Sequence, residues 1–158
     1  MDAFPTAQLA ARERFEIREA VSAWNAALDA GSAEGVLALS EPGIVVRFGD
    51  IAYTGEEGVR QMVRRHGSSS TVARRTHTNH VQAWAAADRV RSRSFMLVVN
   101  LVRADPATDD GAPAIGWLGY AADDLVATPR GWRFAAREFR PWEGDVLSRF
   151  GTASGGAS

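Results

Sequence analysis

The feature that most constrains this chain is a change of hydrophobic period near residue 71. Before it, apolar residues recur every three or four positions, as in Ile17, Val21 and Trp24, which is typical of a helix with one buried face. After it, apolar and polar residues alternate, which predicts long, half-buried strands. Helices followed by a run of antiparallel strands indicate an α+β domain.

The same patterns predict the bounds of the elements. Helices are expected over 7–29, 33–40 and 55–66, short strands over 44–48 and 51–53, and long strands over 71–85, 89–103, 114–128 and 132–140. Gly31 can end the first helix in a left-handed conformation, and Ser32 can cap the second. We therefore expect a single domain over residues 1–142. The Gly/Ser/Ala-rich tail, 143–158, is expected to be partly disordered.

Composition excludes several classes of function. The 158 residues carry a net charge of −1, whereas binding to nucleic acid needs a basic surface. There is no cysteine, and all 18 cationic side chains are arginine, which rules out a thiolate nucleophile, Cys-ligated zinc and a lysine Schiff base. Such exclusive use of arginine is associated with GC-rich bacterial genomes.

Several sequence signals are also absent. No apolar run is long enough to span a bilayer, and the N-terminus has no signal-peptide features, so we expect a cytoplasmic protein without membrane contact. There is no Gly-rich phosphate loop and no two-histidine metal spacing on a helix. We therefore expect neither a cofactor nor a metal.

His77, near the start of the first long strand, is the leading candidate for acid–base chemistry. It shares parity with Ala73 and Val81, so it is expected to face the interior, while His80 faces away if the strand has no bulge. The usual histidine pKa of about 6.5 suits a general base. The alternative is a half-buried histidine whose ring is satisfied by a backbone carbonyl.

Asp29 is the second candidate. A carboxylate in the last turn of a helix meets the negative end of the macrodipole, which costs roughly 0.3–1 kcal/mol. Another interaction should therefore hold it there; the alternatives are a solvated residue or one that accepts a hydrogen bond from Asn25. If Asp29 and His77 meet, they form a dyad. The carboxylate would raise the pKa of the imidazole and burial would lower it, and in either case we expect titration near physiological pH.

Three stretches together resemble the SnoaL-like branch of the nuclear transport factor 2-like superfamily. They are Trp24–Ser32, Arg75–Val81 and Gly131–Arg137, the last preceded by Tyr120–Val126. The likeness covers about residues 8–142 and implies a cone-shaped α+β barrel, with three N-terminal helices packed on a curved antiparallel sheet. Relatives include scytalone dehydratase, polyketide cyclases, ketosteroid isomerase and small subunits of ring-hydroxylating dioxygenases. Fold alone therefore does not fix function.

The resemblance gives further residues a place near the cavity. In scytalone dehydratase and its relatives, the aspartate that matches Asp29 lines the cavity near the histidine. Asn100 and Tyr53 can hydrogen-bond a substrate oxygen. Apolar lining for a polyketide- or steroid-like ligand is expected from Trp24, Phe48, Met96, Trp117 and Trp132. For each of these apolar side chains the alternative is core packing, and for Asn100 it is a polar position near a strand end.

Two positions depart from scytalone dehydratase. Leu28 stands where that enzyme has a tyrosine, and Asn100 stands near the place of its second histidine. These departures weaken the case for a dehydratase of that type. The arginines at 74, 75, 89, 91 and 93 are expected to be solvated or to face another subunit, and His66 to stabilise the end of its helix.

The residues and the resemblance together favour a cofactor-independent lyase, isomerase or cyclase. It would use the His77–Asp29 dyad to move a proton next to the carbonyl of a small hydrophobic compound, and would form a homodimer through the broad sheet face. One alternative is a non-catalytic ligand-binding module or a small structural subunit of a ring-hydroxylating dioxygenase. An epoxide-hydrolase-like enzyme would need an Asp-Arg-Asp trio, which the sequence alone does not identify.

Overall fold

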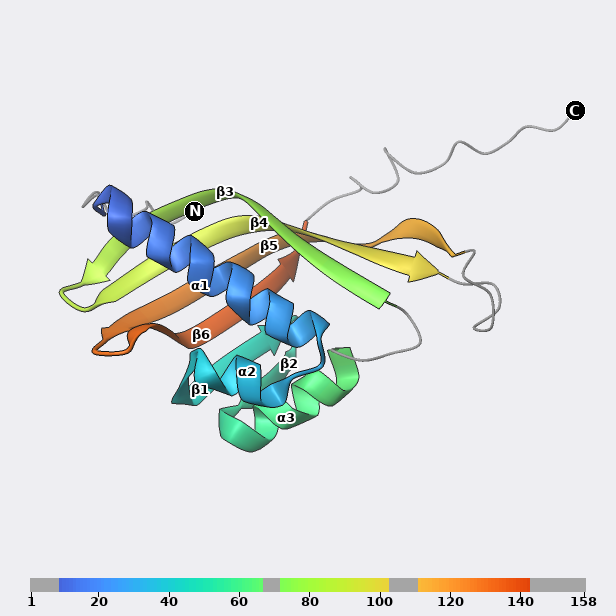
Figure 1. Ribbon diagram of the computed structural model, residues 1–158, viewed down its shortest axis with the longest axis horizontal. Coiled ribbons are helices and arrows are strands. Elements are labelled where there is room, and N and C mark those ends of the chain that lie inside the picture. Colours follow the sequence, from blue (N-terminus) through green and yellow to red (C-terminus); the bar gives the residue numbers. More distant parts are fainter. Residues whose placement is uncertain (1–8, 67–71, 103–110, 143–158) are drawn as a thin grey trace, which may run out of the picture.

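The structure, a computed structural model, describes residues 9–66, 72–102 and 111–142. Three helices pack against one open, curved sheet of six strands in the order β2-β1-β6-β5-β4-β3 (Figure 1). The elements are α1 (Ala11–Asp29), α2 (Ala33–Ala38), β1 (Ser40–Phe48), β2 (Ile51–Thr54), α3 (Gly55–His66), β3 (Val72–Ala86), β4 (Arg89–Val102), β5 (Ala112–Thr128) and β6 (Gly131–Pro141). The predicted α+β class with three N-terminal helices is confirmed. The predicted tail, 143–158, lies outside the described residues.

Two details of the sheet differ from the expectation. β1 runs parallel to β6, so the sheet is mixed, although its other strand pairs are antiparallel. β1 also begins at Ser40, earlier than the predicted strand 44–48, and so contains Pro42 and Gly43. A register shift between Ser40 and Val45 accommodates these two residues within the strand, since an irregular stretch does not need every ladder hydrogen bond.

Helix α1 lies diagonally across one face of the sheet, and α2 and α3 pack at the β1–β2 side (Figure 1). The face of α1 that points to the sheet is fully buried, with Ile17, Trp24 and Leu28 at 0% exposure. Burial of each such side chain stabilises the fold by roughly 1.5–3 kcal/mol. The helix begins later than predicted, at Ala11, because the Glu13 side chain accepts a hydrogen bond from the backbone N–H of residue 10 at 2.9 Å.

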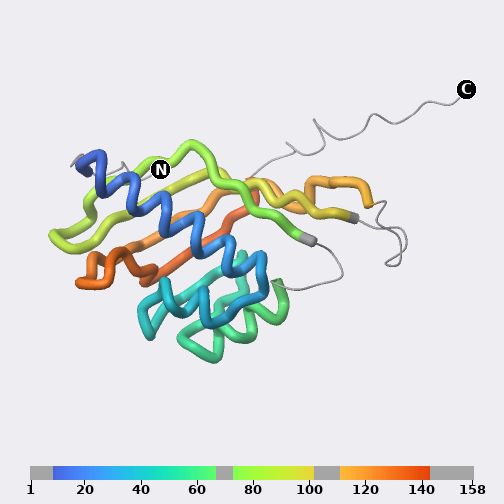
Figure 2. The backbone as a smooth tube through the Cα atoms, viewed as in Figure 1, coloured from blue at the N-terminus to red at the C-terminus, as the bar shows by residue number. Residues whose placement is uncertain are grey.

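The predicted signals at the α1–α2 junction are confirmed. Gly31 has a φ of 69°, a left-handed conformation that glycine adopts without steric cost. Ser32 Oγ accepts a hydrogen bond from the backbone N–H of Gly35 at 3.0 Å. These two residues turn the chain so that α2 starts directly below the end of α1, as the chain trace in Figure 2 shows. None of the helices in the described ranges is long and apolar enough to cross a bilayer.

Strand β3 carries a bulge where regular alternation was expected. Its register on β4 shifts by one residue between Thr78 and Val81, and Asn79 adopts a left-handed backbone with a φ of 53°. The inserted residue changes the alternation, so His80 is half-buried with its ring beside that of His77. His80 was expected to face away from the interior only in a strand without a bulge, and β3 does not meet that condition.

Candidate functional site

A row of polar side chains crosses the interior face of the sheet beneath α1. It consists of His77 and His80 on β3, Ser92 and Ser94 on β4, Asp123 on β5 and Arg137 on β6. We call these residues the polar row. Neighbouring strands bring its members together, since Ser92 pairs with Asp123 and Asp123 pairs with Arg137. Polar groups in a protein interior cost free energy unless they are satisfied, so such a row is a candidate site.

His77 is held in the row by Ser94. The Nδ1 atom of His77 lies 2.8 Å from Ser94 Oγ, while its Nε2 atom is buried and has no hydrogen-bond partner among the described residues. Burial, the largest cause, and the charges of Arg137, His80 and Arg75 together lower the pKa of His77 to about 3. The expected titration near physiological pH is therefore wrong. At pH 7 the imidazole is neutral, with one nitrogen fixed and the other free.

Asp29 is bound by Arg75 of β3. The guanidinium contacts Asp29 Oδ1, and the backbone N–H of Arg75 donates to Oδ2 at 3.1 Å. Arg75 Nη2 also donates to the backbone carbonyl of His66 at 3.0 Å. Because both carbonyl-rich helix ends attract a cation, Arg75 joins the C-terminal ends of α1 and α3 to the sheet and explains the acidic residue in the last turn of α1.

The structure does not join Asp29 to His77 by a hydrogen bond. Both carboxylate oxygens of Asp29 bind Arg75, and the one bonded nitrogen of His77 is bonded to Ser94. Arg75 outcompetes a neutral imidazole because its guanidinium is permanently charged and offers several donors in a planar fork. Arg75 is also not part of a solvated arginine cluster, since only 7% of its side chain is exposed.

A second ion pair, between Asp123 and Arg137, lies at the other end of the polar row. Arg137 Nε donates to Asp123 Oδ1 at 2.8 Å and Nη2 to Oδ2 at 3.2 Å, and both side chains are 0% exposed. The guanidinium carbon lies 4.3 Å from the ring centre of Trp24 and 4.5 Å from that of Phe134. Burial raises the pKa of Asp123, and Arg137 opposes this rise. Arg137 Nη1 has no hydrogen-bond partner among the described residues.

Sequence reasoning did not identify this pair as part of a site. For Asp123 a signal exists, because Asp123 shares parity with the buried Ala121 and Leu125 on β5. Arg137 gives no such signal, because a register shift beside Leu125 places an extra residue in β6 and breaks the alternation that leads to it. A charged residue on the apolar parity of a strand is the pattern that would have indicated Asp123.

Several predicted lining residues gather where α3 ends. Phe48 stacks on His66 with ring centres 4.4 Å apart and on Phe139 at 4.6 Å. The hydroxyl of Tyr53 lies 3.4 Å from His66 Nε2, and Tyr53 is only 3% exposed. Met96 pairs with His77 across the strands and is 2% exposed. Phe48, Tyr53 and Met96 are thus in the interior, with Met96 directly beside His77.

The other predicted lining residues are spread along the molecule. Trp24 is fully buried against Arg137, and Trp132 packs against Trp84 with ring centres 5.8 Å apart. Asn100 lies over Gly116, where its side chain leaves no room for a Cβ atom, and the ring of Trp117 lies against Gly119 on the same strand, β5. The structure therefore does not bring these residues together with His77 into one continuous wall.

The sequence itself settles the family. Residues 9–138 match the family model described as a SnoaL-like domain. The chain belongs to the SnoaL-like family. No protein with a curated functional description matches this SnoaL-like domain.

Solved structures share the fold of this SnoaL-like domain at low sequence identity. Aln2 from a Streptomyces species has a TM-score of 0.74 and 16% identity, over 94% of this chain and 100% of that chain. A putative scytalone dehydratase from Novosphingobium aromaticivorans has a TM-score of 0.70 and 19% identity, over 84% and 85%. A protein from Catenulispora acidiphila in complex with S-DNPA has a TM-score of 0.68 and 23% identity, over 82% and 95%.

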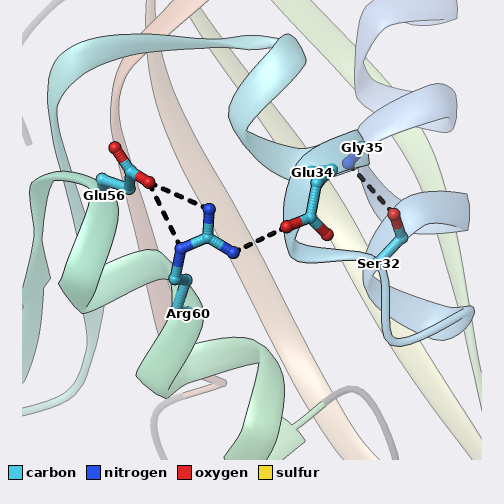
Figure 3. A network of polar contacts seen from close by, with 5 residues as sticks. All are labelled: Ser32, Glu34, Gly35, Glu56 and Arg60. Carbon is cyan, nitrogen blue, oxygen red and sulfur yellow. Dashed lines mark hydrogen bonds and ion pairs between the residues drawn. The ribbon is translucent and has the colours of Figure 1, made fainter.

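Two surface cavities of the SnoaL-like domain lie away from the polar row. One, of about 650 Å³, lies between the start of β1 and the β5–β6 turn and is lined by Glu41 and Arg130 among others. The other, of about 250 Å³, lies between α2 and α3. Beside it, Arg60 bridges Glu34 at 2.6 Å and Glu56 at 2.9 Å (Figure 3). This cluster is solvent-exposed and joins the two helices.

The polar row gives the SnoaL-like domain the elements of an acid–base site. A neutral imidazole, His77, has a free nitrogen, and the arginines that lower its pKa create a positive potential around it. Such a potential stabilises negative charge that develops on a substrate oxygen. Within the described ranges, no group of three or more His, Asp or Glu side chains is placed to hold a metal ion.

Proposed function

We propose that this SnoaL-like domain is a cofactor-independent isomerase, lyase or cyclase that moves a proton next to the carbonyl of a small hydrophobic compound. The observation that carries the proposal is the Nε2 atom of His77, which is buried and has no hydrogen-bond partner among the described residues. Ser94 orients the same ring through Nδ1. A fixed neutral imidazole can accept a proton from a carbon acid, provided that the charge left on the substrate is stabilised.

The arginines supply that stabilisation. Arg137 and Arg75 lower the pKa of His77 because they make the surrounding potential positive. The same potential favours an enolate over a neutral carbonyl compound. As negative charge develops on the substrate, it offsets the arginines and raises the pKa of His77, so the imidazole becomes a stronger base when the proton moves.

Asp29 has an indirect role in this proposal. It fixes Arg75, which lies two residues before His77 on β3 and carries one of the charges that act on the imidazole. Asp29 is thus a positioning residue, and the dyad of the sequence hypothesis becomes a chain from Asp29 through Arg75 to His77. Met96, beside His77, would contact the apolar body of a substrate, and Tyr53 would contact its oxygen. Asn100, Phe48 and Trp117 would contact only parts of a ligand that lie farther from His77. Trp24 and Trp132 support it from the core.

The similar structures support a small organic ligand. One is a putative scytalone dehydratase, and another was solved in complex with S-DNPA. A wholly non-catalytic ligand-binding module would use the same interior, but it would not need a free imidazole nitrogen in a positive potential. Proton transfer is therefore the property to test first.

A homodimer is part of the proposal. On the face of the sheet opposite α1, Phe95 is 37% and Trp142 42% exposed, and their ring centres lie 5.5 Å apart. Val81, on the same face, is 48% exposed. Apolar side chains that cluster on an uncovered sheet are typical of an interface, and a second copy of the chain is the proposed partner. Sedimentation of wild type and Phe95→Glu would distinguish a dimer from a monomer.

The experiment uses 2-tetralone, a bicyclic ketone with acidic protons beside its carbonyl. We expect wild type to accelerate exchange of these protons for deuterium in D2O, measured by proton NMR. His77→Gln should lower the catalysed rate by at least ~10²-fold, the lower range for loss of a general base. Thr76→Ala is the matched control, because Thr76 is the neighbouring residue but is exposed on the other face of β3.

Two outcomes would contradict the proposal. The first is exchange that wild type does not accelerate, for 2-tetralone and for a panel of monocyclic and tricyclic ketones. The second is a folded His77→Gln variant, verified by circular dichroism, with the wild-type rate. Binding of these ketones without exchange would favour the ligand-binding module.

A further inference from the structure

The bulge in β3 gives the interior a second imidazole. In a regular strand, residues three apart face opposite sides, but the inserted Asn79 brings His77 and His80 to the same side. Their ring centres are 6.3 Å apart, with an angle of 27° between the ring planes. Asn79 holds its left-handed backbone at this point, and asparagine tolerates that conformation better than most residues.

Both rings have a buried nitrogen without a partner among the residues that the structure describes. For His77 it is Nε2, since Nδ1 is bonded to Ser94, and for His80 it is Nδ1. A buried polar atom left unsatisfied costs about 1–3 kcal/mol. A single small molecule that contacts both nitrogens would recover this free energy at two places. Because the two rings are neighbours, a ligand that reached both would contact them through atoms close to each other, such as a carbonyl oxygen and the carbon beside it.

The charges around the two rings differ. Three side chains act on His77 through their charge, and each of them lowers its pKa: Arg137, His80 and Arg75. The pKa of His80 is also lowered, by burial first and then by Arg18 and Arg137, but Asp123 and a hydrogen bond to the backbone of His77 oppose this lowering. His80 therefore holds a proton more readily than His77. Two titratable groups whose surroundings act on them unequally are a common arrangement for an acid and a base.

We infer that His80 is the second catalytic residue of this site: its Nδ1–H binds the carbonyl oxygen of the substrate while His77 Nε2 takes a proton from the adjacent carbon. The inference rests on the proposed function and adds to it the residue that binds the carbonyl oxygen of the substrate. His80 would supply a second imidazole from the same strand as His77.

The step balances without any co-reactant. The C–H bond breaks and its proton goes to His77 Nε2, and the electron pair of that bond becomes a C=C bond. The π pair of the carbonyl moves onto the oxygen, where the hydrogen bond from His80 and the charge of Arg137 stabilise it. Return of the proton from His77 to the same or another carbon completes an exchange or an isomerisation.

The probe for this inference is 2-naphthol, a planar phenol with the skeleton and the oxygen position of the enol of 2-tetralone. Because it resembles the reaction intermediate, it should bind to the groups that stabilise that intermediate. We expect saturation with 2-naphthol to shift the Nδ1 signal of His80 in nitrogen NMR of histidine-labelled wild type. An Nδ1 signal that does not move at saturation, while the Nε2 signal of His77 does, would overturn the inference.

Two substitutions at residue 80 give a matched pair. His80→Leu removes the donor, whereas the amide nitrogen of His80→Asn lies near the place of Nδ1. We expect His80→Leu to weaken 2-naphthol binding by about tenfold, as for the loss of one hydrogen bond, and to slow 2-tetralone exchange by roughly 10- to 100-fold. His80→Asn should keep the affinity within about threefold of wild type, since it retains a hydrogen-bond donor.

The outcomes separate the inference from the proposed function. If wild type exchanges 2-tetralone and His77→Gln does not, but His80→Leu matches wild type in both rate and 2-naphthol affinity, the inference fails and the proposed function stands. If wild type does not accelerate exchange of any ketone, the proposed function fails. Equal loss of affinity in His80→Leu and His80→Asn, with both folded, would also overturn the inference, because a donor at that place would then have no effect.

Discussion

The two buried Asp–Arg pairs of this protein are made of the same groups but differ in what they connect. Asp29 and Arg75 join a helix end to an edge strand, with 12% and 7% of their side chains exposed. Asp123 and Arg137 face each other on neighbouring central strands and are 0% exposed. The first pair satisfies helix carbonyls as well as a carboxylate, whereas the second is enclosed by aromatic rings.

This difference determines the role that each pair can have. At a helix end, the macrodipole and the nearby solvent share the charge of Arg75, so losing one partner leaves the other with alternatives. In the centre of the sheet, Asp123 has Arg137 as its counter-charge and is buried away from solvent. An ion pair of the second kind costs much desolvation, and its removal as a whole is less damaging than removal of one half.

The largest expected effect is therefore from breaking the central pair. Arg137→Met should lower the free energy of unfolding by about 3–5 kcal/mol, because it leaves Asp123 charged or forces it to take a proton in an apolar interior. In Arg137→Met/Asp123→Leu most of this loss should be recovered. Urea denaturation followed by circular dichroism measures both. If the double variant is as unstable as the single one, the pair is not the origin of the effect.

The second test is the loss of stability in acid that comes from His77, whose pKa both Arg137 and Arg75 lower. The folded state lowers the pKa of His77 from 6.5 to about 3, so between these values the unfolded chain binds more protons and stability rises with pH. Going from pH 7 to pH 5 should cost about 2 kcal/mol on this account, at about 1.4 kcal/mol per pH unit below 6.5. His77→Gln should lose this part of the pH dependence. An unchanged slope in that variant would contradict the assignment.

Breaking the helix-end pair should have a smaller effect. We expect Arg75→Gln to lower the free energy of unfolding by about 1–2 kcal/mol, since it loses a charged hydrogen bond to Asp29 and one to a helix carbonyl. Because Arg75 also lowers the pKa of His77, the variant should raise that pKa. It should still remain below 6.5, because burial is the larger cause. NMR titration of the His77 ring measures it, and a pKa that falls would contradict the geometry.

The exposed cluster around Arg60 sets the lower end of the comparison. Arg60 bridges Glu34 and Glu56 on the surface of α2 and α3 (Figure 3), where water screens the charges and competes for the hydrogen bonds. Arg60→Gln should leave the urea midpoint unchanged within error. If Arg60→Gln lost as much free energy of unfolding as Arg75→Gln, burial would not determine how much each ion pair contributes to stability.

Much of the fold can be predicted from the sequence because local rules determine it. The α3 bounds, Gly55–His66, agree with the predicted 55–66, and the long strands agree within two residues where the structure describes them. Periodicity, Gly31 and the Ser32 cap each depend on a few neighbouring residues. The interior position of His77 also follows from parity alone, because no bulge lies between the start of β3 and this residue in the described ladder.

The remaining features depend on contacts between distant residues. Nothing near Asp29 in the sequence indicates that Arg75 binds it, since the two are 46 positions apart. The direction of His80 depends on one inserted residue, Asn79, and alternation changes face after any such insertion. The pKa of His77 depends on its depth in the fold and on Arg137 of the last strand. Sequence patterns can identify the groups of this site, but only the fold pairs them.

The bulge at Asn79 also has a consequence for solubility. β3 is an outer strand of an unclosed sheet and is 15 residues long, so its free edge offers backbone donors and acceptors to any extended chain nearby. The irregularity at Asn79, and a second one near Ala86, divide that edge into short regular pieces. A second polypeptide that docked there would have to break its own ladder at the same points, so the residue that turns His80 inward also makes this edge a poorer template for another strand.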